Sequence, residues 1–126
     1  MEIHESAEDY LEAILMIREK KGYVRSIDVA NHMHVSKPSV SYATKKLREN
    51  GFITFNEDGM ILLTDSGLEI AANIYKRHKV LTGIFKHLGV PEEIAAEDAC
   101  KVEHDLSAET FDAICNFIES KNITFE

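Results

Sequence analysis

Residues 26–50 read SIDVANHMHVSKPSVSYATKKLREN, a pattern that predicts two short helices joined by a tight turn. The first helix spans 26–33, and Ser36 caps a second helix over 37–50. Pro38 fits the first turn of the second helix, where no intrahelical hydrogen bond is lost. Two helices in this order predict a helix-turn-helix, whose second helix enters the major groove of DNA.

The segments on either side complete a winged form of this motif. Residues 52–63 read FITFNEDGMILL and predict a strand on each side of a tight Asp58-Gly59 turn. Before the motif, residues 5–20 predict a helix with Ser6 as its N-cap. Its apolar stripe at helical spacing consists of Tyr10, Leu11, Ile14, Leu15 and Ile17.

Helices dominate the rest of the chain. The pattern predicts helices over 64–88, 91–106 and 107–120, with a Gly-Val-Pro break after the first of them. We therefore expect a mostly α fold, with a winged helix-turn-helix domain over 1–72 and a helical domain over 73–126. No apolar run approaches the length of a membrane span, and the acidic N-terminus lacks the features of a signal peptide, so we expect a cytoplasmic protein.

Charge is divided unevenly along the chain. Residues 1–87 carry 12 basic and 12 acidic side chains, whereas residues 88–126 carry 2 and 10 and account for the whole net charge of −8. Within 20–48, seven Lys and Arg residues surround the helix-turn-helix. A basic region of this kind attracts DNA, and an acidic region suits cations or an oligomer interface.

The expected DNA contacts divide into two groups. Small polar groups, a proline and an aromatic begin the recognition helix and can reach base edges. They are Lys37, Pro38, Ser39, Ser41 and Tyr42. Basic residues suited to phosphates are Arg25, Lys45 and Lys46. The alternatives are an exposed helix face without function and a winged helix that binds a protein.

A second constellation lies near the C-terminal end. Cys100, Glu103 and His104 have the spacing i, i+3, i+4 and would share one face of the helix over 91–106. A soft sulfur, a hard oxygen and an imidazole together suit a divalent transition metal. Asp9 and Glu12 repeat the i, i+3 spacing in the first helix.

Each candidate metal ligand also has a simpler interpretation. Acids such as Asp9 and Glu12 stabilise the start of a helix through its dipole. His78 lies within Lys76-Arg77-His78-Lys79, which can be a solvated basic face. Cys100 can be a small core residue, and Cys100 and Cys115 are expected to be free thiols in a reducing cytosol. Taken together, however, the six residues form a mixed nitrogen, oxygen and sulfur set. Its carboxylates and imidazoles suit Mn(II) or Fe(II), and its thiolate favours Fe(II), Co(II) or Zn(II).

Three stretches resemble the diphtheria-toxin-repressor family of dimeric, metal-activated transcriptional repressors. They are SAEDYLE over 6–12, YKRH over 75–78 and EDACKVEHDLS over 97–107. The likeness extends from Ser6 to about Ser120. The family's iron branch usually adds a small barrel domain, which this chain is too short to contain, so its length is similar to that of the manganese-transport regulators.

The resemblance implies a ligand set and leaves the metal open. Asp9, Glu12, His78, Glu103 and His104 match the pattern that holds a pair of metals in the manganese branch. Cys100 stands where that branch has Glu and is similar to the iron branch. Thr82 and Ala96 occupy positions where the iron branch carries a carboxylate and a histidine for its second site. The resemblance therefore implies Fe(II) or Mn(II), with one or two ions per subunit.

The expected function is a metal-activated DNA-binding repressor that controls iron or manganese homeostasis. It would bind a pseudo-palindromic operator as a homodimer. The apolar residues of the last helix would contribute to the dimer interface or close the monomer core, and both roles are compatible. One alternative is a winged-helix regulator that senses a thiol oxidant or a small molecule through Cys100. A non-haem metal enzyme is the other, and the sequence offers it neither a Gly-rich phosphate loop nor a nucleophile-base pair, so we predict no enzyme.

Overall fold

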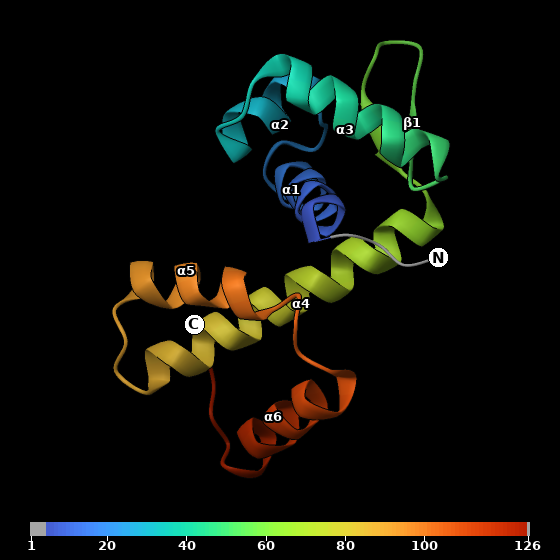
Figure 1. The fold of residues 1–126 in the computed structure, drawn as a ribbon. Coiled ribbons are helices and arrows are strands. Elements are labelled where there is room, and N and C mark those ends of the chain that lie inside the picture. Colours follow the sequence, from blue (N-terminus) through green and yellow to red (C-terminus); the bar gives the residue numbers. More distant parts are fainter. Residues whose placement is uncertain (1–4, 126) are drawn as a thin grey trace. The chain divides into compact units, whose positions relative to one another are not determined.

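The computed structural model describes residues 5–125 and divides into two compact units between Asn73 and Ile74. The fold is mostly helical with one small hairpin, as the sequence predicts (Figure 1). Among the described residues, no helix combines the length and the apolar character needed to cross a membrane.

The first unit contains three helices, a hairpin and the start of a fourth helix. These elements are α1 (Glu5–Lys21), α2 (Ser26–Met33), α3 (Lys37–Glu49), β1 (Ile53–Phe55), β2 (Ile61–Leu63) and the beginning of α4 (Asp65–His87). All five residues of the predicted stripe on α1 are buried, and α1 packs against α2, α3 and β2. Ser6 lies inside α1, so the prediction that it caps this helix is wrong.

α3 buries one face in the core of the first unit and leaves the other face exposed to solvent. Ser36 caps α3 by accepting a hydrogen bond from the Ser39 backbone N–H at 3.2 Å. On the inner face of α3, Val40, Thr44 and Leu47 are buried in the core of the unit. The opposite face therefore points its polar and basic residues to solvent.

The hairpin forms the predicted wing. β1 and β2 are antiparallel, with Ile53 opposite Leu63 and Phe55 opposite Ile61. At the tip, Gly59 adopts a positive φ of 77°, which favours glycine in a tight turn. α4 starts directly beneath the wing, where a Cβ at Gly67 would lie 2.0 Å from the Phe52 carbonyl oxygen. A side chain at position 67 would therefore disrupt the junction of wing and helix.

The second unit contains the rest of α4, then α5 (Glu92–Val102) and α6 (Ala108–Ser120). Figure 1 shows α5 alongside the C-terminal half of α4. The buried apolar residues of the second unit come from all three helices and are Ile74, Leu81, Ala95, Ala99 and Phe111. α5 is shorter than predicted, because the helix ends at Val102 and residues 103–105 form a turn. Ser107 then caps α6 as predicted, accepting from the Thr110 backbone N–H at 3.1 Å.

Candidate metal centre and DNA-contact face

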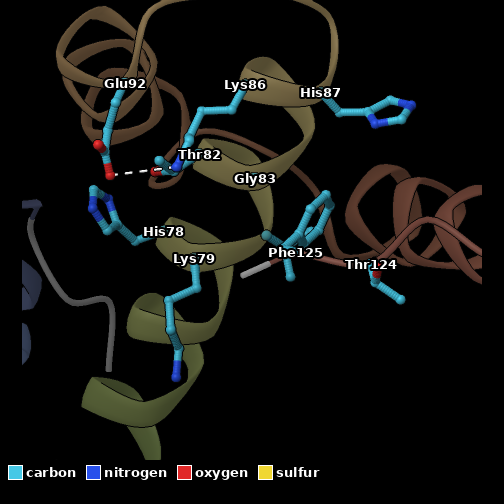
Figure 2. Close-up of a pocket in the computed structure, with 10 residues that line it drawn as sticks. His78, Lys79, Thr82, Gly83, Lys86, His87, Glu92, Thr124 and Phe125 are labelled. Atoms are coloured by element: carbon cyan, nitrogen blue, oxygen red, sulfur yellow. Dashed lines mark hydrogen bonds and ion pairs between the residues drawn. The ribbon is translucent and has the colours of Figure 1, made fainter.

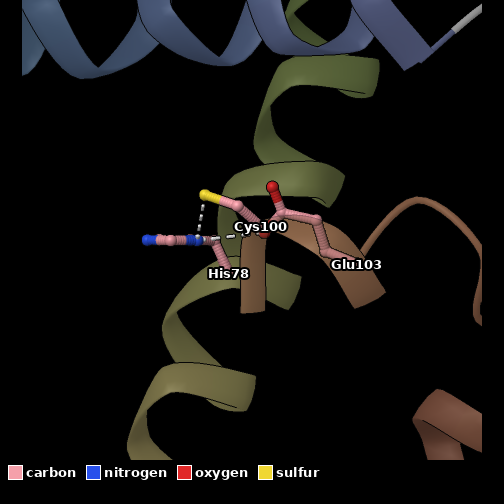
Figure 3. A group of neighbouring side chains, drawn as sticks. All are labelled: His78, Cys100 and Glu103. Carbon is pink, nitrogen blue, oxygen red and sulfur yellow. Dashed lines mark hydrogen bonds and ion pairs between the residues drawn. The ribbon is translucent and has the colours of Figure 1, made fainter. Parts of the chain in front are cut away.

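Three of the predicted ligands meet in the second unit. His78 projects from α4, Cys100 from the last turn of α5, and Glu103 from the residue that follows α5 (Figure 3). One ligand atom from each side chain lies within 4.8 Å of the others. His78 Nδ1 is the shared partner, at 3.0 Å from Glu103 Oε2 and 3.7 Å from Cys100 Sγ.

The early end of α5 changes how this cluster is built. Cys100, Glu103 and His104 do not share one helix face, because only Cys100 lies within α5. Glu103 nevertheless keeps right-handed helical backbone angles, and its N–H donates to the Ala99 carbonyl at 2.9 Å. The i, i+3 relation to Cys100 therefore survives. His104 lies beside Glu103, with its Nε2 3.5 Å from Glu103 Oε1.

Burial gives the Glu103 carboxylate its chemical importance. Its side chain is 0% exposed. Oε2 is paired with His78, whereas Oε1 accepts no hydrogen bond within the part of the chain that the structure describes, although His104 Nε2 lies 3.5 Å away. A buried carboxylate oxygen without a donor is costly unless a positive charge compensates it. This arrangement fits a divalent cation.

The cluster also holds a proton in the absence of metal. The Cys100 sulfur and the Glu103 carboxylate, both hydrogen-bonded to Nδ1, raise the pKa of His78 to about 10 against the opposing effect of burial. His78 is therefore protonated at neutral pH and occupies the place of a cation between two ligand groups. A metal ion would have to displace that proton, because a histidine ligand is neutral.

Two of the simpler interpretations do not survive these observations. His78 is half-buried and paired, so it does not belong to a solvated basic face. Cys100 is exposed, so it is not a core packing residue, and both cysteines are free thiols as predicted. A nitrogen, an oxygen and a sulfur donor in one place can together bind Fe(II), Co(II) or Zn(II).

A cavity of about 570 Å³ is lined in part by His78 (Figure 2). Thr82 lines it, and Thr82 Oγ1 is buried without a hydrogen bond to any described residue. The carboxylate of Glu92 also reaches the cavity but is paired with Lys86 at 3.4 Å. Among described residues, this cavity does not present a second cluster of metal ligands.

Asp9 and Glu12 belong to the first unit. They lie one helical turn apart on α1, where Asp9 is half-buried and Glu12 is 7% exposed. Burial of the Glu12 side chain goes beyond what helix-dipole stabilisation requires. Both residues remain proposed ligands.

All eight predicted DNA-contact residues are exposed. We call this set, Arg25, Lys37, Pro38, Ser39, Ser41, Tyr42, Lys45 and Lys46, the DNA-contact face. Tyr42 is 67% exposed, and the Lys46 ammonium lies 5.6 Å from the centre of its ring. Arg25 is tied to the wing, because its Nη1 donates to the Asp58 carbonyl at 2.9 Å.

Arg77 precedes His78 on α4, and no role was predicted for it from the sequence. Its guanidinium donates hydrogen bonds to the carbonyls of Glu103 and Leu106. The only signal in the sequence is its place next to a candidate ligand, and spacing alone does not reveal a contact with residues 26 and 29 positions away.

Comparison with known families covers nearly the whole chain. Residues 2–60 match the family described as "Iron dependent repressor, N-terminal DNA binding domain". Residues 64–122 match "Iron dependent repressor, metal binding and dimerisation domain". The first match contains the helix-turn-helix, and the second contains His78, Cys100 and Glu103.

Individual relatives agree with these matches. The chain is 34% identical over 117 residues to an uncharacterized HTH-type transcriptional regulator of Methanocaldococcus jannaschii, covering 91% of this chain and 94% of that protein. It is 32% identical over 114 residues to the HTH-type transcriptional regulator MntR of Bacillus subtilis, covering 90% of this chain and 80% of MntR.

Solved structures share the fold. The metal-dependent transcriptional regulator MtsR superposes with a TM-score of 0.82 at 32% identity, over 90% of this chain and 53% of MtsR. A manganese-dependent transcriptional repressor in complex with manganese gives 0.80 at 28% identity, over 90% of this chain and 52% of that one. This chain thus spans about half the length of these two proteins. With both domains matched and the fold shared, the chain belongs to the iron-dependent repressor family of transcriptional regulators, which is the diphtheria-toxin-repressor family that its sequence resembles.

Proposed function

We propose that the protein is a metal-activated transcriptional repressor that controls iron or manganese homeostasis. In this proposal, a divalent transition metal binds the second unit, and the homodimer then binds a pseudo-palindromic operator in the cytoplasm. Membership of a family of transcriptional regulators excludes the enzyme alternative. The single observation that carries the proposal is the cluster of His78, Cys100 and Glu103, with one buried carboxylate oxygen unsatisfied among the described residues.

His78, Cys100 and Glu103 would hold the ion, and Asp9, Glu12 and His104 are the further ligands that we propose. When bound, the metal supplies positive charge that compensates the carboxylates and the thiolate. His78 gives up its proton on binding, and the buried Glu103 carboxylate exchanges its protonated histidine partner for the metal ion.

Ligands from segments that are far apart in the sequence would link metal binding to DNA binding. Ordering the chain before DNA arrives removes part of the entropic cost of forming the complex, so apparent DNA affinity rises. Thermodynamic linkage requires that DNA raise metal affinity by the same factor.

The donor set bears on which metal is used. Imidazole and carboxylate ligands accept Mn(II) or Fe(II), while the exposed Cys100 thiol adds a soft donor that favours Fe(II) over Mn(II). In the cavity beside His78, Thr82 offers no carboxylate, and the carboxylate of Glu92 is paired with Lys86. These features favour one ion per subunit at this end of the site, with Fe(II) as the stronger candidate.

The DNA-contact face and α6 supply the remaining parts of the proposal. The exposed residues at the start of α3 suit the major groove, and Arg25, Lys45 and Lys46 suit phosphates. On α6, Phe111 is buried, whereas Phe117 is 53% exposed and is available for a dimer interface. A two-fold dimer presents two recognition helices to two half-sites.

The decisive experiment measures DNA binding with and without metal. Protein stripped by chelator would be used to select sequences from a random duplex DNA pool, in anaerobic Fe(II), in Mn(II), and in chelator alone. We expect sequence-specific binding only with metal. Full-affinity, sequence-specific binding by metal-free protein would contradict the proposal.

One alternative retains a structural argument. Cys100 is exposed and its sulfur lies 3.7 Å from His78 Nδ1, an environment in which a cysteine can also sense oxidants. Co(II) separates the two functions. A ligating Cys100 produces a sulfur-to-Co(II) charge-transfer band that Cys100→Ser loses and Cys115→Ser keeps. DNA binding that responds to peroxide but is insensitive to chelator would instead identify a thiol sensor.

A further inference from the structure

Arg77 occupies an unusual place in the second unit. It is half-buried, and the two N–H bonds of Nη1 point at carbonyl oxygens, Glu103 O at 3.1 Å and Leu106 O at 2.6 Å. Its guanidinium also lies 5.3 Å from the centre of the Phe111 ring on α6. One side chain of α4 therefore connects the turn after α5 and the first turns of α6.

None of these three contacts of Arg77 is an ion pair with a carboxylate. Its partners are backbone carbonyls at both ends of the 103–106 segment, so its role is to hold a backbone shape. The segment needs such support, because α5 ends without a glycine or proline after Val102. Inside the turn, the N–H groups of Glu103 and Asp105 donate to the carbonyls of Ala99 and Val102, at 2.9 and 3.0 Å.

Residues 103–106 also carry a group of the metal centre. Glu103 is the first residue of this segment, and its carboxylate reaches His78, the residue next to Arg77 on α4. Arg77 thus fixes the backbone of Glu103 to the same helix that carries the histidine. Cys100 is different, because it lies inside α5, which is anchored by the buried Ala95 and Ala99.

We propose that Arg77 is a positioning residue of the metal centre, which holds the 103–106 turn on α4 and so keeps the Glu103 carboxylate beside His78. The inference rests on the proposed function. It predicts that loss of Arg77 affects the two ligands of this region unequally: Glu103 becomes mobile, whereas Cys100 keeps its place.

The test compares Arg77→Gln and Arg77→Lys with the matched control Lys76→Gln. Lys76 is exposed on the same helix, so its replacement removes the same charge without touching the turn. The first measurement is amide hydrogen exchange in metal-free protein. We expect faster exchange at residues 103–107 in Arg77→Gln, and wild-type exchange there in Lys76→Gln.

The second measurement is Co(II) titration by absorbance. In Arg77→Gln we expect affinity lower by about 10- to 100-fold, the range typical of groups that orient a metal ligand. The sulfur-to-Co(II) band should persist, while the ligand-field bands change because Glu103 no longer coordinates. Arg77→Lys can restore one of the two hydrogen bonds and should be intermediate.

The outcomes test the proposed function and the role of Arg77 separately. Wild-type protein that binds no Co(II) would overturn the proposed function. Wild-type binding with unchanged affinity and spectrum in Arg77→Gln would overturn only the role of Arg77. If circular dichroism shows that Arg77→Gln is unfolded, Arg77→Lys decides, and a wild-type affinity and spectrum for that variant would overturn the inference.

Discussion

The outer face of α3 and the end of α5 hold the side chains of the two proposed sites in opposite ways. On α3, Tyr42 and its basic neighbours point to solvent, and the buried face of the helix alone holds them in place. At the end of α5, Glu103 is fully buried and depends on His78 and Arg77 of α4. Residues of the first kind can be changed one at a time, whereas those of the second kind are coupled.

The largest expected effect comes from removing the charge of Glu103. Glu103→Gln keeps the shape of the side chain but leaves the protonated His78 without its buried anion and removes a hard ligand. We expect metal affinity to fall by at least about 100-fold, beyond the range typical of groups that merely orient a ligand. The measurement is competition for Co(II) against an indicator chelator.

Glu97→Gln is the control for this variant, because Glu97 is exposed on α5, the helix that Glu103 directly follows. It removes an equal charge without altering the cluster, and its affinity should match the wild type. A loss of less than about threefold for Glu103→Gln would show that Glu103 is not a ligand, and that the buried pair with His78 is purely structural.

The next effect in size tests the independence of α3. Tyr42→Ala should cost about 1–3 kcal/mol on the selected DNA sequence and relax sequence preference. Metal affinity of the free protein should not change, since Tyr42 is exposed on the first unit. Fluorescence anisotropy with the selected and a scrambled duplex measures both affinities, and Tyr42→Phe distinguishes ring contacts from those of the hydroxyl. Equal weakening on both duplexes would mean that α3 does not read the sequence through this residue.

The same difference between α3 and the end of α5 determines which features could be predicted from the sequence. The recognition helix follows from local chemistry: the Ser36 cap, Pro38 in the first turn, and apolar positions at helical spacing. The structure confirms these features. On α1, too, the apolar stripe correctly predicts the buried face of the helix. The predicted N-cap is wrong, because Ser6 already lies inside the helix.

The metal centre could be predicted only in part. His78, Cys100 and Glu103 were predicted as ligands from residue types, spacing and the family resemblance, and the structure brings these three side chains together. The end of α5 was placed four residues too late, since Leu106 was expected in the helix and Val102 ends it. Neither glycine nor proline follows Val102 to mark that end. The contacts of Arg77 with the turn are tertiary and involve residues far along the chain, so no periodic pattern contains them.

A further effect concerns pH and arises only at the coupled site. Because the pKa of His78 is raised from 6.5 to about 10 in metal-free protein, its hydrogen bonds with Cys100 and Glu103 contribute stability that is fully present below pH 6.5. That contribution is lost as pH rises from 6.5 through about 10. Thermal unfolding of metal-free protein over this range should show the decline, and Glu103→Gln should reduce it.

Metal binding should have the opposite dependence on pH. Since a bound metal needs neutral His78, each ion displaces that proton, and affinity should rise about tenfold per pH unit from this group alone. Calorimetry in buffers of different ionisation enthalpy counts the protons released. Cys100→Ser, which has no thiol proton at this position, should still release about one proton at pH 7. A count near zero for that variant would show that His78 is neutral before metal binds.

The smallest expected effect asks how independent the residues of α3 are of one another. Lys46→Ala should weaken binding to selected and random DNA alike and make the salt dependence shallower by about one unit, as expected for a phosphate contact. The Lys46 ammonium also lies 5.6 Å from the centre of the Tyr42 ring, so the two side chains can stabilise each other by about 0.5–1 kcal/mol. A double-mutant cycle on the selected duplex measures that coupling, with Lys45→Ala replacing Lys46→Ala in the control cycle. If Tyr42 couples by this amount with Lys46 but not with Lys45, the interaction on this face of α3 is limited to one neighbouring pair. Coupling above about 2 kcal/mol would contradict the comparison, because the exposed face would then be as interdependent as the buried centre.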